Sequence, residues 1–309
     1  MQPSKGFEEL WRGVAYPWEC DHMGHMNVQH HMAKAVEAAG WLQHRIGIAP
    51  GIAGRERRGL APVADYLRFH REVRAGDILV GRGAVLEVSE SSLSYALEMI
   101  DAATDEVCVT SHVTAAHVSM DTGESIPWNA AEQQGAMEFI RDWSGDLAPR
   151  SPLPDPDLAA RADIDADRRA GFIDSYRGLV HAWECDRFGL MTASGFMARF
   201  SYAVWHVGAA LGVGPTYYRD GGVTAGLYYH LRYHRPVRAG DTLAMVSALV
   251  EHSDRRHRFL HKLYDVTSGA LLATDDTMGI NIDPKTRRPI QWPPEIAAKS
   301  RALQVKVPA

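Results

Sequence analysis

Two stretches of the chain have the capping residues of a helix, and the first repeats apolar residues at the three- and four-residue spacing of an amphipathic helix. The first runs from Asn27, a natural N-cap residue, to about Gly47, a natural stop. Thr192 and Gly212 take the same two places in the second stretch. The apolar positions of the first stretch are Met32, Val36, Ala39 and Leu42, whereas Lys34, Glu37 and Gln43 fall elsewhere. The pattern therefore predicts a long helix near the start of each half.

Extended segments bounded by turn residues follow the first predicted helix. The predicted strands are Val63–Val73, Ile78–Val88, Leu93–Asp101 and Val107–Met120, with Val14–Trp18 as a strand before the helix. Because the connecting turns are short, we expect the four later strands to form one antiparallel meander. The meander would curl around the helix and bury its apolar face.

The chain is an internal duplication. The segment YLRFHREVRAGD at 66–77 returns as HLRYHRPVRAGD at 230–241, identical at nine of twelve positions. The motif Trp-Glu-Cys-Asp at 18–21 returns at 183–186. We therefore expect a first domain over 1–144 and a second over 173–309. The segment 145–172 is rich in Pro, Asp, Ala and Arg, a composition typical of a linker.

Composition and charge narrow the class of protein. The 309 residues are 46% hydrophobic and 23% charged, as in ordinary soluble proteins. The net charge of −5 gives no basic face for a nucleic acid, and no apolar run approaches the ~18 residues of a membrane helix. The start of the chain does not look like a signal peptide. Three cysteines without a Cys-x-x-Cys pair fit a reducing compartment, so we expect a cytoplasmic protein without nucleic-acid or membrane partners.

The segment Trp18-Glu19-Cys20-Asp21-His22-Met23-Gly24-His25-Met26-Asn27 resembles the D-x-D-x-x-G-H-x-N signature of the 4-hydroxybenzoyl-CoA thioesterase-like family. Glu19 stands where the first acid of that signature usually lies, and Asp21 where the catalytic acid does. The resemblance implies an α+β fold of two tandem hotdog domains, each a long helix wrapped by a curved antiparallel sheet. It also implies hydrolysis of an acyl thioester, most often an acyl-CoA. No cofactor is expected beyond the coenzyme A of the substrate.

Thioester hydrolysis needs an attacking group and a stabilised oxyanion. Amides at a helix N-terminus point outward with partial positive charge, so those just after Asn27, beginning with Val28, suit an oxyanion hole. The resemblance makes Asp21 either the nucleophile or the general base, and the sequence does not choose between them. His25 and Asn27 would orient the water or the acid. Glu37 matches a helix glutamate frequent in the family, although a structural bond to a neighbouring strand explains it equally well.

The two copies are not equivalent. Asp186 preserves the acid, but Leu190 replaces His25 and Thr192 replaces Asn27. We therefore expect an active first site and a degraded second site. Hotdog dimers build each site between subunits, so strands of the second half would complete the Asp21 pocket. Two of their residues on one strand face, Arg232 and His234, are candidates for the phosphates of coenzyme A, with a solvated strand face as the alternative.

Other functions remain open at this stage. An acyl-carrier-protein thioesterase is the nearest enzymatic alternative, and a non-catalytic acyl-CoA sensor is an alternative of another class. The histidines at 22, 25, 30 and 31 lack convincing metal-ligand spacing, so we expect no metal. A homo-oligomer, specifically a dimer of double hotdogs, is expected because sheet edges or backs would remain open.

Overall fold

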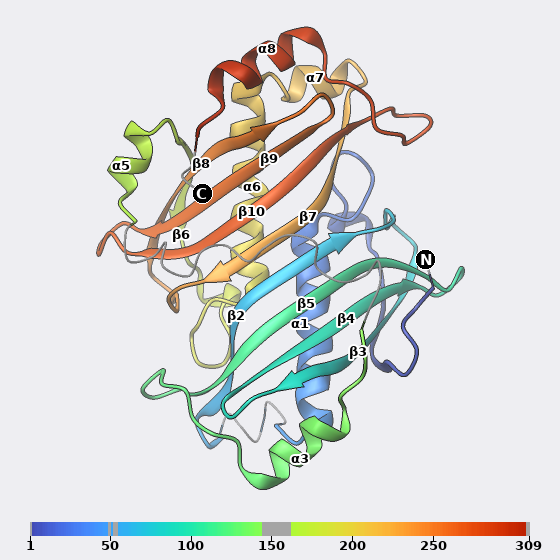
Figure 1. The fold of residues 1–309 in the computed structure, drawn as a ribbon, viewed down its shortest axis with the longest axis vertical. Coiled ribbons are helices and arrows are strands. Elements are labelled where there is room, and N and C mark those ends of the chain that lie inside the picture. The colour runs from blue at the N-terminus through green and yellow to red at the C-terminus, as the bar shows by residue number, and fades with distance from the viewer. Residues whose placement is uncertain (1, 49–50, 52–54, 144–161, 307–309) are drawn as a thin grey trace. The chain divides into compact units, whose positions relative to one another are not determined.

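Each half of the chain contains a strand, a 3-10 turn, a long helix and four further strands, in that order (Figure 1). The computed structural model describes residues 2–48, 51, 55–143 and 162–306. The first half contains β1 (Glu8–Val14), η1 (Pro17–Glu19), α1 (Val28–Arg45), β2 (Arg58–Phe69), β3 (Ile78–Val88), β4 (Ser92–Asp101), β5 (Glu106–Ser119) and α3 (Ala130–Glu138). The second half contains α5 (Ile164–Arg169), β6 (Ile173–Leu179), η2 (Ala182–Glu184), α6 (Ala193–Leu211), α7 (Pro215–Arg219), β7 (Val223–Tyr233), β8 (Thr242–His252), β9 (Arg256–Asp265), β10 (Leu271–Ile282) and α8 (Pro294–Leu303).

The two long helices begin and end where their capping residues predicted. The Asn27 side chain accepts a hydrogen bond from the Gln29 amide at 3.0 Å, which satisfies one of the amides that a helix start leaves unpaired. Gly47 and Gly212 follow the helix ends with φ of +87° and +93°, a backbone conformation that favours glycine. The predicted helices at Asn27–Gly47 and Thr192–Gly212 are therefore confirmed.

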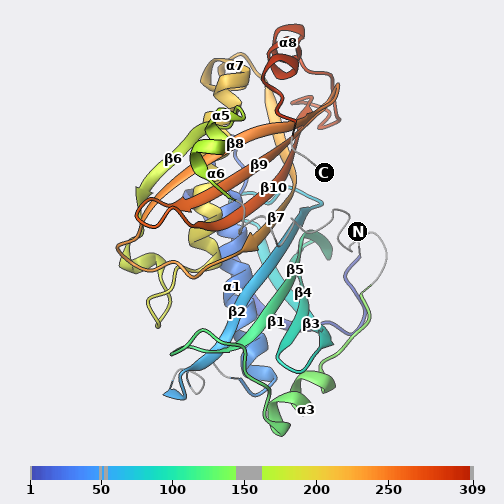
Figure 2. The ribbon, with the colours of Figure 1, turned by 60° about the vertical axis from the view of Figure 1, so that its left-hand side comes forward.

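The long helices lie across one face of their own sheets (Figures 1 and 2). The core under α1 includes Leu10, Ala38, Ala39, Leu42, Val85, Leu97 and Val113. Two helix positions differ from the periodicity-based prediction. Lys34 is buried, at 7% exposure, and Val36 is exposed, at 37%. The burial of Lys34 depends on a carboxylate partner, which the apolar pattern alone does not reveal.

The first five strands form an antiparallel sheet in the order β1-β3-β4-β5-β2. The predicted meander is correct for β3, β4 and β5, but β2 pairs with β5 and not with β3. The segment after β2 forms no hairpin, because the carbonyl of Val73 accepts the Met26 amide at 2.7 Å and that of Asp77 accepts the Ala15 amide at 2.9 Å. In the second half, β6-β8-β9-β10-β7 repeats the same order.

The first predicted strand, Val14–Trp18, was wrong in position. Strand β1 ends at Val14, and Pro17–Glu19 forms the 3-10 turn η1. Pro17 has no amide to donate to a neighbouring strand. The Tyr16 amide instead donates to the Glu19 carboxylate at 2.8 Å, and the Glu19 amide donates back to the Tyr16 carbonyl at 3.0 Å. These local bonds favour a turn.

Two compact units divide the chain, one built mainly on β1 to α3 and the other on α5 to α8. Residues 145–161 of the predicted linker lie outside the described residues. Its last part forms α5, where Asp167 accepts hydrogen bonds from Lys262 at 2.6 Å and Tyr264 at 2.5 Å. The boundaries 1–144 and 173–309 stay predictions. Within the described ranges, no helix has both the length and the apolar character needed to cross a bilayer.

Candidate active site

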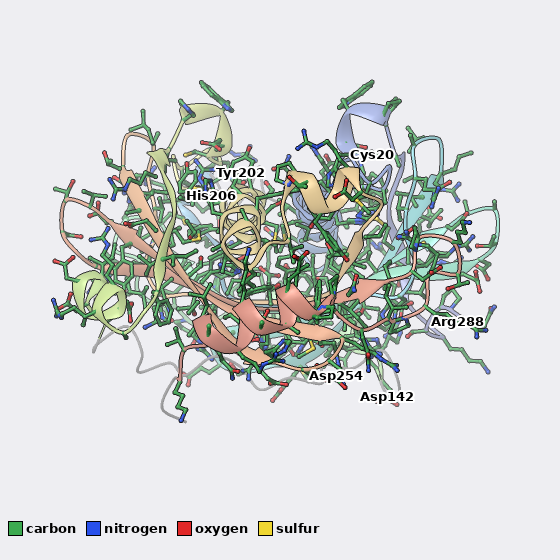
Figure 3. The ribbon with its side chains drawn as sticks, turned by 90° about the horizontal axis from the view of Figure 1, so that it is seen from above. Cys20, Asp142, Tyr202, His206, Asp254 and Arg288 are labelled. Atoms are coloured by element: carbon green, nitrogen blue, oxygen red, sulfur yellow. The ribbon has the colours of Figure 1, made fainter. Side chains whose placement is uncertain are left out.

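The loop between η1 and α1 carries Asp21 and is closed by its own backbone. Cys20, labelled in Figure 3, forms an isolated bridge with Met26. The Asp21 amide donates to the His25 carbonyl at 2.9 Å, and the Gly24 amide donates to the Asp21 carbonyl at 2.9 Å. Gly24 has φ of +77°, so a side chain there would strain the turn. The sequence therefore builds a tight turn with the acid at its first position.

The Asp21 carboxylate has a polar neighbour at each oxygen. Its Oδ1 accepts the Met23 amide at 2.8 Å, and its Oδ2 lies 3.5 Å from His25 Nε2. The Asp21 and His25 side chains are 20% and 19% exposed. A carboxylate with fixed orientation and partial access to solvent can meet a substrate carbonyl or a water. The structure therefore brings together the first two predicted catalytic residues.

Glu72 is a third member of this group, and the sequence analysis did not identify it. Its Oε1 lies 3.5 Å from His25 Nδ1, and Arg74 Nη2 lies 3.2 Å from its Oε2. Glu72 sits on the segment between β2 and β3, far from the motif in sequence. The sequence contained one sign that Glu72 belongs with His25, because the second copy replaces both residues, His25 by Leu190 and Glu72 by Pro236.

Asn27 and Val28 have different tasks at the start of α1. The Asn27 side chain caps the Gln29 amide, and its carbonyl accepts the His30 amide at 3.0 Å. Among the described residues, none accepts a hydrogen bond from the Val28 amide. Asn27 thus shapes the helix start, and the Val28 amide is available to an oxyanion.

Glu19 connects the turn to the helix. Its carboxylate accepts Lys34 Nζ at 2.6 Å, and its carbonyl accepts the Asn27 amide at 2.9 Å. Burial alone would raise the pKa of Glu19, but the hydrogen bonds from Lys34 and the Tyr16 amide outweigh it, and the pKa lies below its usual value. In the second copy Arg199 donates to Glu184. The sequence contained a sign of this ion pair, because a basic residue follows the glutamate by 15 positions in both copies.

Glu37 has a structural partner away from the Asp21 turn. Its Oε2 accepts a hydrogen bond from Trp11 Nε1 on β1 at 2.6 Å, and the residue is exposed. It lies ten residues beyond Asn27, or about 15 Å along the helix. This geometry favours the alternative of a helix residue bonded to a strand. Its role in substrate binding stays a prediction.

The second copy keeps the turn but changes the chemistry. Asp186 Oδ1 accepts the Phe188 amide at 2.8 Å, and Gly189 has φ of +74°. Leu190 occupies the position of the imidazole. Thr192 Oγ1 lies 2.9 Å from Ser194 Oγ at the start of α6. The turn of the second copy thus keeps the acid and lacks a counterpart of His25, and the degraded second site stays a prediction.

His234 lies just after β7 in a partly buried environment. Burial, followed by the charge of Arg232, lowers the pKa of His234 to about 4. Its Nε2 is 3.3 Å from Thr274 Oγ1. A neutral imidazole offers no positive charge to a phosphate near pH 7, so any charge attraction would come from Arg232. Phosphate binding by this pair stays a prediction.

The expected absence of a metal site stays a prediction. Within the part of the chain that the structure describes, His, Cys, Asp and Glu side chains form no group of three or more suited to a metal ion.

A family model for the thioesterase-like superfamily matches residues 16–160 and 180–300. No curated protein sequence gives a significant match. Among solved structures, an acyl-ACP thioesterase from Bacteroides thetaiotaomicron matches with a TM-score of 0.64 and 11% identity, over 88% of this chain and 97% of its own. The 12:0-ACP thioesterase from Umbellularia californica matches with a TM-score of 0.63 and 10% identity, over 89% and 94%. The family match over both halves confirms the α+β architecture of two tandem hotdog domains.

Proposed function

The chain belongs to the thioesterase-like superfamily, and we propose that it hydrolyses an acyl thioester to a carboxylic acid and a free thiol at Asp21. The observation that carries this proposal is the position of the Asp21 carboxylate. It is partly exposed, accepts the Met23 amide on one oxygen, faces His25 with the other, and lies in the turn that leads to the start of α1. The group that attacks and the amide that stabilises the oxyanion thus belong to one short continuous segment, residues 21–28.

Two routes fit this geometry. In the first, an Asp21 oxygen attacks the carbonyl carbon, the C–S bond breaks with its electron pair on sulfur, and water hydrolyses the resulting anhydride. In the second, Asp21 takes a proton from a water whose oxygen attacks the carbonyl carbon. The Val28 amide would stabilise the oxyanion in both. One such donor contributes on the order of 100-fold or more to kcat.

We propose coenzyme A as the thiol that carries the acyl group. The alternative is an acyl carrier protein, favoured by one observation. The two matching structures named above span both halves of this chain, and each is named as an acyl-ACP thioesterase. A non-catalytic acyl-CoA sensor would bind thioesters without releasing thiol.

Thiol release measured with a thiol-reactive chromophore tests the proposal. The substrates would be short, medium, branched, aromatic and charged acyl-CoAs, together with acyl carrier proteins bearing the same acyl groups. We expect Asp21→Asn to lower kcat/KM by roughly 100-fold or more, and the matched variant Asp186→Asn to remain near wild type. Absence of release from every substrate by the folded protein would exclude a thioesterase of this scope. Equal losses in both variants would contradict the asymmetry of the two sites.

A single turnover in ¹⁸O-labelled water separates the two routes. An anhydride can be opened at either carbonyl, so the nucleophilic route can place ¹⁸O in the Asp21 carboxylate. The general-base route leaves Asp21 unlabelled and delivers the label to the carboxylic acid product. Mass spectrometry of the peptide that contains Asp21 distinguishes them.

A further inference from the structure

The His25 imidazole lies between two carboxylates. Its Nε2 is 3.5 Å from Asp21 Oδ2, and its Nδ1 is 3.5 Å from Glu72 Oε1. An ionised carboxylate accepts hydrogen bonds and cannot donate them. Each ring nitrogen therefore faces an oxygen that favours a proton on that nitrogen. Two negative charges at this distance stabilise the imidazolium over the neutral ring.

We propose that Glu72 is a positioning residue that keeps His25 protonated, so that His25 orients Asp21 and supplies the proton to the departing sulfur. This inference rests on the proposed thioester hydrolysis. When the C–S bond breaks, its electron pair goes to sulfur, and the Nε2 proton of His25 moves to that sulfur. The products of this step are a neutral thiol and a neutral imidazole, which takes up a proton from solvent before the next cycle.

Backbone contacts join the segment of His25 to the segment of Glu72, and they do not involve the side chains of these two residues. His25 forms an isolated antiparallel bridge with Arg74, and the Met26 amide donates to the Val73 carbonyl at 2.7 Å. Glu72 precedes this contact directly. These backbone contacts therefore keep the Glu72 carboxylate close to the His25 imidazole.

The second copy provides an internal control. Its backbone frame is the same, since Leu190 bridges Arg238 and the Met191 amide donates to the Val237 carbonyl at 2.8 Å. Leu190 stands in place of His25, and Pro236 in place of Glu72. The frame thus forms without either polar side chain. The glutamate occurs in the copy that has the histidine, as expected if Glu72 acts through His25.

Two further titratable or charged groups lie near this pair, His31 and Arg74, and neither changes the assignment. Burial, followed by the charge of His25, lowers the pKa of His31 on α1 to about 3, so that ring is neutral near pH 7. The Arg74 side chain contacts Glu72 but is 62% exposed. Solvent screening therefore weakens its effect on the imidazole.

Titration of His25 by NMR tests the link between Glu72 and His25 without any need for turnover. The His25 signal is identified by its absence in His25→Asn. Removing an opposite charge at this distance lowers a histidine pKa by about one unit, so Glu72→Gln should shift the His25 titration downward by that amount. Arg74→Gln is the matched control and should leave the midpoint unchanged or raise it. An unmoved midpoint in Glu72→Gln, or an equal downward shift in Arg74→Gln, overturns the inference.

The pH profile of kcat/KM tests the catalytic part. Activity that requires the imidazolium falls as pH rises through the His25 pKa, and this fall forms the basic limb. Glu72→Gln should move that limb about one pH unit lower, with roughly tenfold less activity above it. In the His25→Asn background, Glu72→Gln should have no further effect, because Glu72 acts through the histidine. If Glu72→Gln lowers kcat/KM by the same factor in wild type and in His25→Asn, the inference is overturned. A shifted NMR titration in a protein without turnover would contradict the proposed function and leave the Glu72–His25 link standing.

Discussion

Lys34 and Glu19 form a 2.6 Å ion pair inside the first domain, with side chains only 9% and 12% exposed. The same glutamate accepts the Tyr16 amide through its carboxylate and the Asn27 amide through its carbonyl. Glu19 therefore connects the 3-10 turn, the end of the Asp21 loop at Asn27 and the second turn of α1. The second domain repeats the arrangement with Arg199 and Glu184.

Lys34→Met should destabilise the protein and disturb the Asp21 turn. Removing one partner of a buried ion pair leaves the other charge uncompensated, at a cost of about 3–5 kcal/mol. We expect a decrease of that order in the free energy of unfolding, measured by urea denaturation, with lower thiol release. Lys34→Arg should retain most of the stability, because the second domain uses arginine at this position. A Lys34→Met protein as stable as wild type would show that the pair is not a fastening point.

Val28→Pro should remove the proposed oxyanion donor and leave the helix intact. Proline is tolerated at the first helical position, where its missing amide breaks no intrahelical bond. Asn27 already has ψ of 145°, which suits a residue before proline. We expect kcat to fall about 100-fold with little change in Tm. The control Ala193→Pro, at the first position of α6, should leave kcat unchanged. Wild-type kcat in Val28→Pro would exclude this amide from the oxyanion hole.

Local signals in the sequence determine much of this fold, and long-range partners determine the rest. Caps and turn residues predicted both long helices, and β3 begins and ends at the predicted residues Ile78 and Val88. The pairing of β2 with β5 was not predicted, because it depends on hydrogen bonds between segments distant in sequence. Lys34 was placed on the wrong face for the same reason, since spacing along a helix does not show a buried carboxylate on the preceding turn.

The candidate site likewise contains residues that a local motif predicts and one residue that only a distant segment supplies. The motif pointed to Asp21 and His25, and the structure places them 3.5 Å apart. Glu72 follows His25 by 47 residues and belongs to no local pattern. The paired change to Leu190 and Pro236 was its only trace. A motif within one half cannot show this pair, because Glu72 and His25 change together only between the two halves.

The protein should lose stability in mild acid because some of its histidines are buried in neutral form. Burial lowers the pKa values of His31, His257 and His261 to about 3. In the unfolded chain these groups titrate at about 6.5. Between these values the unfolded state binds protons that the folded state does not, so stability falls as pH decreases from about 6.5 toward 3.

His261→Leu provides a direct test of this acid sensitivity, because the first domain has Leu97 at the equivalent position. The variant should take up about one proton fewer on unfolding near pH 5. The slope of unfolding free energy against pH should therefore decrease by about 1.4 kcal/mol per pH unit. Urea denaturation between pH 4.5 and 7 measures it. Parallel curves for the variant and wild type would show that His261 is not buried in neutral form.

The contribution of Asp275 to stability should have the opposite pH dependence to that of the buried histidines. It is fully buried on β10, and burial, followed by the charge of Asp276, raises its pKa well above the usual value. The folded state therefore keeps a proton that the unfolded state loses above about pH 4. Stability is present below the unfolded pKa and falls as pH rises toward the folded pKa.

Asp275→Asn should remove this dependence, so its stability relative to wild type should increase as pH rises from 5 to 8. The expected slope is about 1.4 kcal/mol per pH unit wherever the folded protein still holds the proton. The first domain offers the reverse experiment, because buried Ser111 occupies the equivalent position. Ser111→Asp should create a loss of stability with rising pH that wild type lacks at this site. A constant difference between Asp275→Asn and wild type across this range would mean that Asp275 is ionised in the folded protein.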